Sequence, residues 1–413
     1  MRTNKRKIVN DPVYGFININ SEIIFDLIEH PFFQRLRRIK QLGLTNLVYP
    51  GAMHSRFQHA LGAMYLMDQA ISIIRLKGHE ITNEEAEAVN IAILLHDIGH
   101  GPFSHALEFS LIENITHENL SEMLMDELNV QFQGKLNLAI DIFKNKYQKK
   151  FLHQLVSGQL DMDRLDYLRR DSFFTGVTEG IVGSDRIIKM LNVVDDNLVV
   201  EEKGIYSIEK FLIARRLMYW QVYLHKTVLS AENLLVNILK RAKLLSLQGE
   251  DLFATPALKY FLSRSFKEPA KLSNENKREM IENFVLMDDT DIVASSKVWE
   301  SHSDVVLSLL CKNMNNRKLY KIKLQNSPFE DAYLEELKQK MYLNIQLSHD
   351  ELTYFVFSDS VTNLTYVPSD NNIGILLNNG SVVDISEASD ILNVQVLSKA
   401  VKKFFLCYPK DLI

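Results

Sequence analysis

ILLHDIGHGPFSH, residues 93–105, is the stretch of sequence from which we predict the fold of this chain. It closes a helical pattern over residues 83–96, NEEAEAVNIAILLH, which begins with acidic residues and ends fully apolar. The second half of that helix is therefore expected to be buried on all sides, and the following glycines and proline end it. His96 and Asp97 would then lie together at the buried end of a core helix.

A buried ionisable pair of this kind costs several kcal/mol unless a cation or a hydrogen-bond network satisfies it. A bound metal is the simplest solution, and imidazole nitrogen with carboxylate oxygen suits Fe, Mn, Zn or Mg rather than a thiolate-binding ion. His59, on the predicted helix upstream, and an aspartate of LDMDRLDYLRRD, residues 160–171, are candidates for further ligands. The competing interpretation is a satisfied surface pair, which a lone His-Asp dipeptide usually is.

Helical periodicity dominates the chain as far as about residue 350, so we predict a mainly α fold. Small side chains early in the helix over residues 54–76 would let another helix approach closely. The predicted helices cover residues 21–41 (divided by Pro31 and capped by Ser21), 54–76, 83–96, 116–128, 141–157 and 207–244. A short hairpin is expected at residues 197–206, and a small sheet from strands near residues 353–357 and 374–385.

Composition excludes several classes of protein. With 46% hydrophobic and 24% charged residues in 413, the chain can bury a sizeable core, and its length suggests two or three lobes. No apolar run approaches a membrane span and the N-terminus lacks a signal-peptide pattern, so a cytoplasmic protein is expected. Two cysteines without motif spacing disfavour a disulfide framework. The net charge of −5 disfavours a protein that coats nucleic acid.

The ordered motifs HSRFQH, HDIGHGPFSH, THE and LDMDRLDYLRRDS together resemble the HD-domain superfamily, in its deoxynucleoside triphosphate (dNTP) triphosphohydrolase branch. The segments IVNDPVYG, HPFFQRLRRIKQLG and YPGAMHSRFQHALG extend the resemblance, which runs from about residue 7 to 230. It implies an HD-domain helical bundle over residues 1–245, with the metal and catalytic core at about 50–175. The remainder, 246–413, would be a mixed α/β lobe that makes oligomer or regulatory contacts.

The resemblance also implies an activity: metal-dependent hydrolysis of dNTPs to deoxynucleoside and inorganic triphosphate. It implies one divalent metal and leaves open a second that arrives with the substrate phosphates. It further implies a homo-oligomer, a dimer or tetramer, and an activating nucleotide, with no membrane partner. In this reading His105 protonates the leaving 5′-oxygen, while Glu108 takes the place of the family's aspartate beside it.

Carried over residue by residue, the resemblance assigns three groups of positions. The metal ligands are His59, His96, Asp97 and Asp163, and the catalytic residues are His100, His105, Glu108 and His117. The substrate-binding residues are Gln41 and Leu42 at the deoxyribose, with Arg56, Arg164, Tyr167, Asp171, Arg215, Arg216 and Tyr223 around the sugar and phosphates.

A second nucleotide, bound between subunits, is a further expectation from the resemblance. The positions that match such a regulatory site are Lys7, Asn10, Glu29, Gln34, Arg37, Arg317 and Lys321. Glu29 replaces an aspartate of the family, so guanine selectivity does not carry over. The competing interpretation is that Arg37 and its neighbours form an ordinary solvated helix face.

Two other functions stay open at this point. One is an HD phosphohydrolase that acts on another nucleotide or phosphoester, favoured if Gln41, Tyr167 and Tyr223 lie away from the metal. The other belongs to a different class: a nucleotide-sensing or nucleic-acid-binding module whose metal is structural. Salt-sensitive binding to single strands without turnover would favour that second function.

Overall fold

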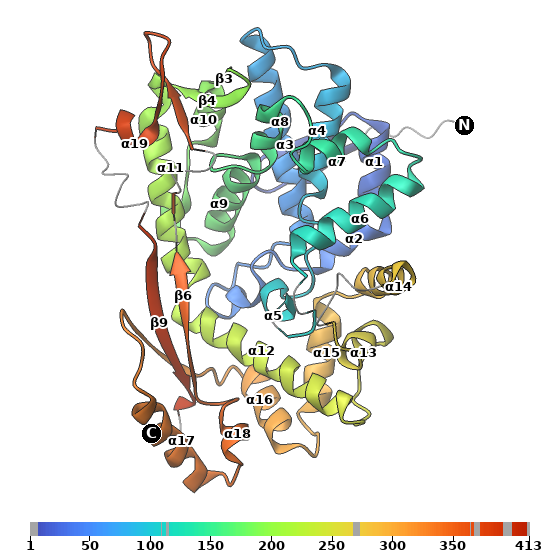
Figure 1. The fold of residues 1–413 in the computed structure, drawn as a ribbon, viewed down its shortest axis with the longest axis vertical. Coiled ribbons are helices and arrows are strands. Elements are labelled where there is room, and N and C mark those ends of the chain that lie inside the picture. Colours follow the sequence, from blue (N-terminus) through green and yellow to red (C-terminus); the bar gives the residue numbers. More distant parts are fainter. Residues whose placement is uncertain are drawn as a thin grey trace.

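The computed structural model describes residues 7–108, 110–112, 115–266, 273–363, 365–366, 372–390 and 399–410; the side chains of His105, Glu108 and Asn274 lie outside the described set. The fold is mainly α, as predicted (Figure 1). The helices are α1 (Glu22–Glu29), α2 (Pro31–Gln34), α3 (Arg56–Leu76), α4 (Asn83–Leu95), α5 (Ser104–Glu108), α6 (His117–Gln131), α7 (Asn137–Phe143), α8 (Lys150–Val156), α9 (Met162–Thr175), α10 (Ser184–Met190), α11 (Ile205–Met218), α12 (Lys226–Leu247), α13 (Pro256–Leu262), α14 (Asn274–Phe284), α15 (Asp289–Trp299), α16 (Val305–Asn315), α17 (Asp331–Asn344), α18 (His349–Leu352) and α19 (Ile385–Ala388).

Helix α3 is the centre of the body and packs against α4 on one side and α9 on the other. The second half of α4, from Ala88 to Leu95, is buried throughout, as its apolar sequence predicts. The predicted close approach at the small residues of α3 is with α9: a Cβ atom on Gly62 would lie 2.1 Å from side-chain atoms of both Asp166 and Arg170. Glycine at this position therefore allows two charged side chains of α9 to lie against the α3 backbone.

Capping side chains start several helices where the sequence predicts them. The Ser21 hydroxyl accepts a hydrogen bond from the Ile24 amide at the start of α1, and Thr116 caps α6 through the Asn119 amide. The start of α6 lies directly on the turn after α4, because a Cβ atom on Gly99 would lie 2.2 Å from the His117 carbonyl oxygen. This contact holds His117 beside the His-Asp turn.

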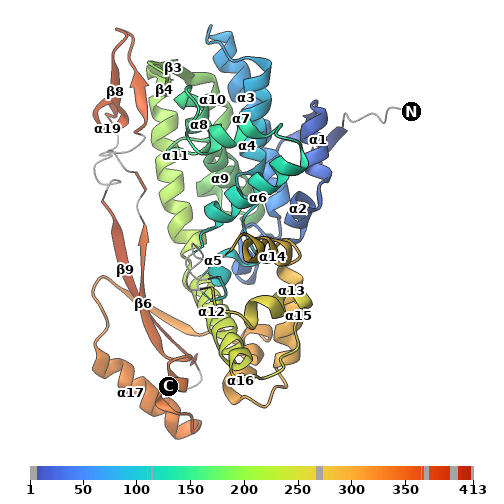
Figure 2. The ribbon, with the colours of Figure 1, turned by 45° about the vertical axis from the view of Figure 1, so that its right-hand side comes forward.

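The strands form three small sheets beside the helices. They are β1 (Lys7–Asp11) with β2 (Gly15–Ile19); β3 (Leu191–Val194), β4 (Asn197–Glu201), β7 (Gly374–Leu376) and β8 (Val382–Asp384) in that order; and β5 (Lys321–Gln325), β9 (Val401–Tyr408) and β6 (Phe357–Asn363) in that order. In Figure 2 the antiparallel pair β6–β9 runs along one side of the helical body. The β4–β7 pairing joins residues 199–201 to residues 374–376.

Four sequence expectations need correction. The helix predicted over residues 141–157 is divided, because α7 ends at Phe143 and α8 begins at Lys150, with Asn145 in the left-handed conformation between them. The hairpin predicted at residues 197–206 lies earlier, because Asp195 and Asp196 adopt the left-handed conformation and turn β3 into β4. The strand expected at 353–357 begins only at Phe357. The helix predicted over 207–244 is two helices, since a π-helical turn, η5 (Tyr219–Tyr223), ends α11 before His225 caps α12.

Helix α12 crosses the predicted domain boundary at residue 245 and contacts α5, α13 and α16, so the boundary stays a prediction. No helix among the described residues is both long enough and apolar enough to cross a lipid bilayer.

Candidate metal centre and adjoining cavity

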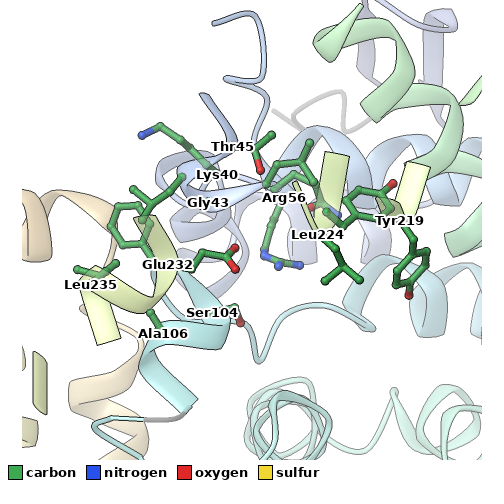
Figure 3. A pocket seen from close by; sticks show the side chains of 15 residues that line it. Lys40, Gly43, Thr45, Arg56, Ser104, Ala106, Tyr219, Leu224, Glu232 and Leu235 are labelled. Atoms are coloured by element: carbon green, nitrogen blue, oxygen red, sulfur yellow. The ribbon is translucent and has the colours of Figure 1, made fainter. Parts of the chain in front are cut away.

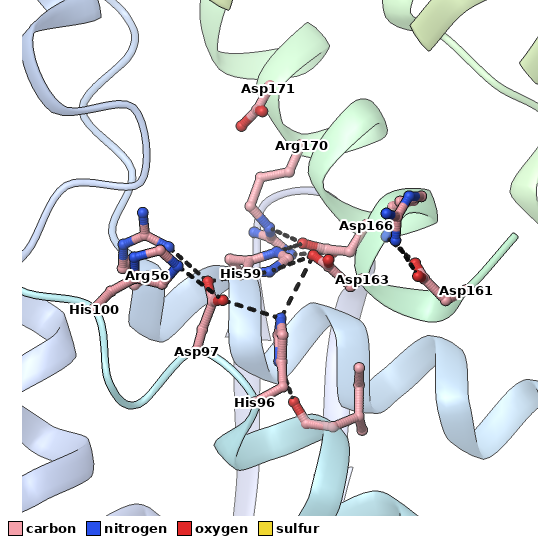
Figure 4. A network of polar contacts seen from close by, with 12 residues as sticks. Arg56, His59, His96, Asp97, His100, Asp161, Asp163, Asp166, Arg170 and Asp171 are labelled. Carbon is pink, nitrogen blue, oxygen red and sulfur yellow. Dashed lines mark hydrogen bonds and ion pairs between the residues drawn. The ribbon is translucent and has the colours of Figure 1, made fainter. Parts of the chain in front are cut away.

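Three predicted ligands converge where α3, α4 and α9 meet. His59, His96 and Asp163 each offer a ligand atom, and these atoms all lie within 4.8 Å of one another (Figure 4). The Asp163 Oδ1 atom lies 3.1 Å from His59 Nε2 and 3.5 Å from His96 Nε2. The fourth predicted ligand, Asp97, borders the cluster, with its carboxylate oxygens 3.4 Å from His96 Nε2 and 3.8 Å from His59 Nε2.

The other nitrogen of each imidazole is held by an oxygen that only accepts hydrogen bonds. His59 Nδ1 donates to Asp166 Oδ2 at 2.7 Å, and His96 Nδ1 donates to the Ile93 carbonyl oxygen at 2.6 Å. In a neutral imidazole this leaves the lone pair on Nε2. Both Nε2 atoms are buried and make no hydrogen bond within the described residues. Two lone pairs and a carboxylate that face one point, each oriented by a second contact, fit a divalent cation.

The carboxylates around the two imidazoles favour positive charge at this point. Burial by itself would lower the pKa of His59, but the neighbouring carboxylates of Asp163 and Asp166 outweigh it and raise that pKa to about 10. The pKa of His96 is also raised, because the charges of Asp97 and Asp163 outweigh its burial. A bound cation would satisfy the same negative potential without protonating the ligands.

Asp97 connects the ligand cluster to Arg56. Arg56 Nη1 donates to Asp97 Oδ2 at 2.6 Å, and both side chains are buried. Asp97 Oδ1 lies 3.2 Å from His100 Nε2, while Ser104 bonds His100 Nδ1. Burial, together with the charge of Arg56, lowers the pKa of His100 to about 3, so this imidazole is neutral at physiological pH. His117 stacks on it with a ring-centroid distance of 4.0 Å.

A second polar group lies about two helical turns beyond Asp163 along α9. Asp171 is buried and bridges two side chains: it accepts from His54 Nε2 and from the Tyr223 hydroxyl, both at 2.7 Å. His54 holds Asp171 in place and stacks on Phe174. The Tyr167 ring lies edge-on to Tyr223, at 6.1 Å between centroids. These contacts bring Tyr167, Asp171 and Tyr223 together.

A cavity of about 250 Å³ adjoins this network (Figure 3). Gln41, Leu42, Arg56 and Tyr223 line it, so four predicted substrate residues share one space. Backbone hydrogen bonds explain the placement of Gln41, since its amide donates to the His54 carbonyl beside the start of α3. Because Arg56 belongs both to the cavity wall and to the Asp97 pair, the cavity lies next to the metal centre. The full lining is Lys40, Gln41, Leu42, Gly43, Leu44, Thr45, Arg56, Phe103, Ser104, Ala106, Tyr219, Tyr223, Leu224, Glu232 and Leu235.

Three arginines of this region keep unused hydrogen-bond donors. Nε of Arg56, Nε of Arg164, and both Nε and Nη1 of Arg215 are buried without a partner in the described part of the chain. Arg164 pairs with Asp161 through its Nη1, and the nearby charge of Asp163 favours the protonated form of Arg164. Arg215 lies close enough to Tyr167 for its charge to oppose the rise that burial causes in the pKa of Tyr167. Buried N–H groups that lack partners are costly. An anion that accepts these hydrogen bonds would remove that cost.

The remaining predicted residues divide into two groups. The side chains of His105 and Glu108 lie outside the described residues, so their catalytic roles stay predictions. Among the regulatory positions, Lys7 pairs with Glu29 at 2.8 Å, and Arg37 donates to Gln34 at 2.8 Å. Asn10 lies in β1 and Lys321 in β5, while Arg317 donates to the Leu47 carbonyl. Within the described residues, hydrogen bonds and ion pairs do not link Arg317 or Lys321 to the other five positions. Arg216 lies on α11 beside Arg215.

The sequence interpretation missed two polar residues. Asp166 orients His59, and its signal was its spacing three residues after Asp163, which places both carboxylates on one face of α9. Glu232 lines the cavity, and nothing near it in the sequence marks it as different from a solvated helix residue.

Comparisons with known proteins agree with this arrangement. The model of the HD domain family matches residues 56–168, and that of the HD associated region matches residues 182–251. The protein YwfO of Bacillus subtilis is 33% identical over the whole of this chain, which covers 94% of its length. A crystal structure of a phosphohydrolase from Bacteroides thetaiotaomicron superposes with a TM-score of 0.94 at 54% identity, over 98% of this chain and 100% of that one.

A relative whose name states a substrate matches less of the chain. The deoxynucleoside triphosphate triphosphohydrolase SAMHD1 homolog of Dictyostelium discoideum is 32% identical over 57% of this chain and 49% of its own length. The matched HD model spans His59, His96, Asp97 and Asp163, and thus all four predicted ligands. On its sequence, its fold and its relatives, this chain belongs to the HD-domain family of phosphohydrolases.

Proposed function

We propose that this HD phosphohydrolase hydrolyses dNTPs to deoxynucleoside and inorganic triphosphate. The observation that carries the proposal is the juxtaposition of a His-His-Asp cluster with a cavity that contains Gln41, Leu42, Arg56 and Tyr223. The resemblance to the triphosphohydrolase branch assigns these positions to a deoxyribose and its phosphates. Relatives that carry this activity in their names, from Dictyostelium discoideum and Danio rerio, support it at 32% and 29% identity over about half of the chain.

The charges of the site suit a triphosphate. Arg56, Arg164 and Arg215 present four buried N–H donors without partners, and phosphate oxygens accept hydrogen bonds from guanidinium groups strongly. His59, His96 and Asp163, with Asp97 beside them, would hold a divalent metal whose identity is unknown. When bound, such a metal supplies Lewis acidity, which activates water and neutralises charge on the phosphorus centre.

The protein's own side chains would orient the substrate and donate the proton to the leaving group. The arginines orient the phosphate chain toward the cluster, so that the reacting groups meet in a fixed geometry. The neutral His100, packed against His117, offers a polar surface without adding positive charge. His105 would donate the proton to the 5′-oxygen that leaves, with Glu108 as its partner. Attack at the α-phosphorus and cleavage of its bond to the 5′-oxygen give the two products.

The activator and the oligomer belong to the same proposal. In this proposal a nucleotide binds between subunits and drives their assembly. Lys7, Arg37 and the other regulatory positions would contact that nucleotide. Substitution of Arg37 with alanine should then weaken assembly in the presence of nucleotide while metal content is unchanged. Size-exclusion chromatography that shows equal assembly of both proteins would remove Arg37 from the regulatory site.

Product analysis tests the proposed function directly. Metal-replete protein is incubated with each dNTP alone and with all four together, with Mn²⁺ or Mg²⁺ added. Deoxynucleoside and triphosphate are the expected products, and turnover that requires the mixture would establish activation. A matched His96→Ala protein should lose metal and turnover together. Bound metal without any product from the wild-type protein would refute the proposal and favour another phosphoester or a sensing role.

A further inference from the structure

One carboxylate in the cavity is not used by the metal centre or by the arginines. Glu232 lies on α12, and Leu235, one turn further on, faces the same space. Figure 3 shows the Glu232 carboxylate directed into the cavity from the α12 side, while Arg56 enters from α3. Among the lining residues of this cavity, Glu232 alone is acidic.

The Glu232 carboxylate lacks a protein partner. It makes no hydrogen bond or ion pair within the described residues, although Lys40 and Arg56 line the same cavity. Burial alone raises the pKa of Glu232 to about 7, and no neighbouring cation counteracts this effect. A desolvated carboxyl without a partner costs free energy, which a ligand with hydrogen-bond donors would recover.

Apolar side chains share the cavity with Glu232. Figure 3 shows Ala106 and Leu235 on the same side of the cavity as Glu232, and Leu42, Phe103 and Leu224 also line this cavity. Phe103 holds a left-handed backbone conformation, with a φ of 47°, which is unusual for an aromatic residue. Such walls accept the face of an aromatic ring system, and the carboxylate would meet the ring's edge. Phosphates are expected at the opposite, arginine-bearing side of the cavity.

We propose that Glu232 recognises the hydrogen-bonding edge of the nucleobase and selects guanine; the inference rests on the proposed dNTP substrate. At pH 8 or above Glu232 is mainly ionised, and its carboxylate has two parallel acceptor oxygens. Guanine alone of the four bases places two donors side by side, at N1 and at the exocyclic N2 amino group. Adenine and cytosine place a ring acceptor beside the amino group, and thymine flanks its single N–H with carbonyl oxygens, so a carboxylate would be repelled there.

Binding of non-hydrolysable analogues of the four dNTPs, measured by calorimetry at about pH 8, tests this inference without requiring turnover. The guanine analogue should bind the wild-type protein most tightly. In Glu232→Gln one acceptor becomes a donor, so its Kd should rise about tenfold to a hundredfold, the worth of a charge-assisted pair. The other three analogues should change less than about threefold. Glu250→Gln, an exposed residue just beyond α12 with the same charge change, should match the wild type.

Each other outcome has a defined meaning. Equal binding of all four analogues to the wild-type protein, or an unchanged preference in Glu232→Gln, would overturn the inference and leave the proposed function intact. Guanine-selective binding without deoxynucleoside and triphosphate from any dNTP would support Glu232 and overturn the proposed function. Failure of every analogue to bind metal-replete protein would overturn both. A thermal melt of Glu232→Gln confirms that the variant is folded.

Discussion

The hydrogen bond between Asp166 and His59 gives the sharpest test of how the metal centre is built. Both side chains are fully buried, and Asp166 Oδ2 accepts from His59 Nδ1 at 2.7 Å and from Arg170 Nε at 2.9 Å. Asp166 Oδ1 accepts from Arg170 Nη2 at 3.0 Å. In Asp166→Asn the amide oxygen can serve only one of these positions. If it stays with His59, the amide nitrogen faces the Arg170 guanidinium, donor against donor.

The size of the effect follows from these contacts. Loss of a partner that orients a metal-binding histidine typically weakens metal affinity by about 10–100-fold, or about 1.4–2.8 kcal/mol. The metal-free protein should also be destabilised by about 2–3 kcal/mol, which is less than the usual cost of breaking a buried pair. The reduction is expected because Arg170 Nη1 keeps its 2.8 Å contact with Asp11.

Competition with a chelator of known affinity, followed by metal analysis, measures the Kd of the metal in each protein. The matched control is Asp161→Asn, which changes another fully buried carboxylate at the start of the same helix. Asparagine caps a helix as well as aspartate does, and Asp161 contacts Arg164 rather than His59. The control should keep wild-type metal affinity. Wild-type affinity in Asp166→Asn would refute the role of this hydrogen bond.

Three further changes test two residues of the site and one buried carboxylate outside it, Asp289, which accepts a hydrogen bond from the Lys40 amide. His105→Ala should retain stoichiometric metal and lose turnover by at least about a hundredfold, as measured by metal content and product formation, whereas loss of metal would show that His105 belongs to the ligand set. Arg215→Met should raise the KM for dNTP about tenfold or more with metal content unchanged, because two unpartnered donors of Arg215 are removed; an unchanged KM would place the phosphates elsewhere. Burial raises the pKa of Asp289 to about 6 from 3.8, so its contribution to stability is present below about pH 4 and is lost as the pH rises to about 6. Denaturant unfolding at several pH values should therefore find Asp289→Asn more stable than the wild type at pH 7 by about 3 kcal/mol, with little difference at pH 4; parallel pH profiles would contradict this.

The sequence predicted the buried His96–Asp97 pair because its signals are local, whereas the family resemblance assigned Asp163. His96 and Asp97 follow the apolar second half of α4, and a buried pair at that point needs a cation or a hydrogen-bond network. The helix itself was equally predictable, since Thr82 and Glu85 form a capping box at its start. Ser21 and Thr116 likewise begin helices, because each side chain accepts a hydrogen bond from a backbone amide in the first turn.

Other features depend on contacts that no local pattern reveals. Glu232 resembles a solvated residue of an amphipathic helix until α12 is packed against α5 and its carboxylate faces a cavity. The π-helical turn that presents Tyr219 and Tyr223 to this cavity adds a residue to a helix whose periodicity is otherwise unbroken. The hairpin was predicted too late in the chain because its turn is formed by two consecutive aspartates, Asp195 and Asp196. They adopt the left-handed conformation that glycine or asparagine most often adopts.

Hydrolysis in oxygen-18-labelled water tests the central claim most directly, because it reports which bond is broken. Metal-replete protein is incubated with a dNTP, and both products are analysed by mass spectrometry. Attack of water on the α-phosphorus predicts one labelled oxygen in inorganic triphosphate and none in the deoxynucleoside. Label in the 5′-hydroxyl of the deoxynucleoside, or products that are nucleoside mono- or diphosphates, would contradict the proposed reaction.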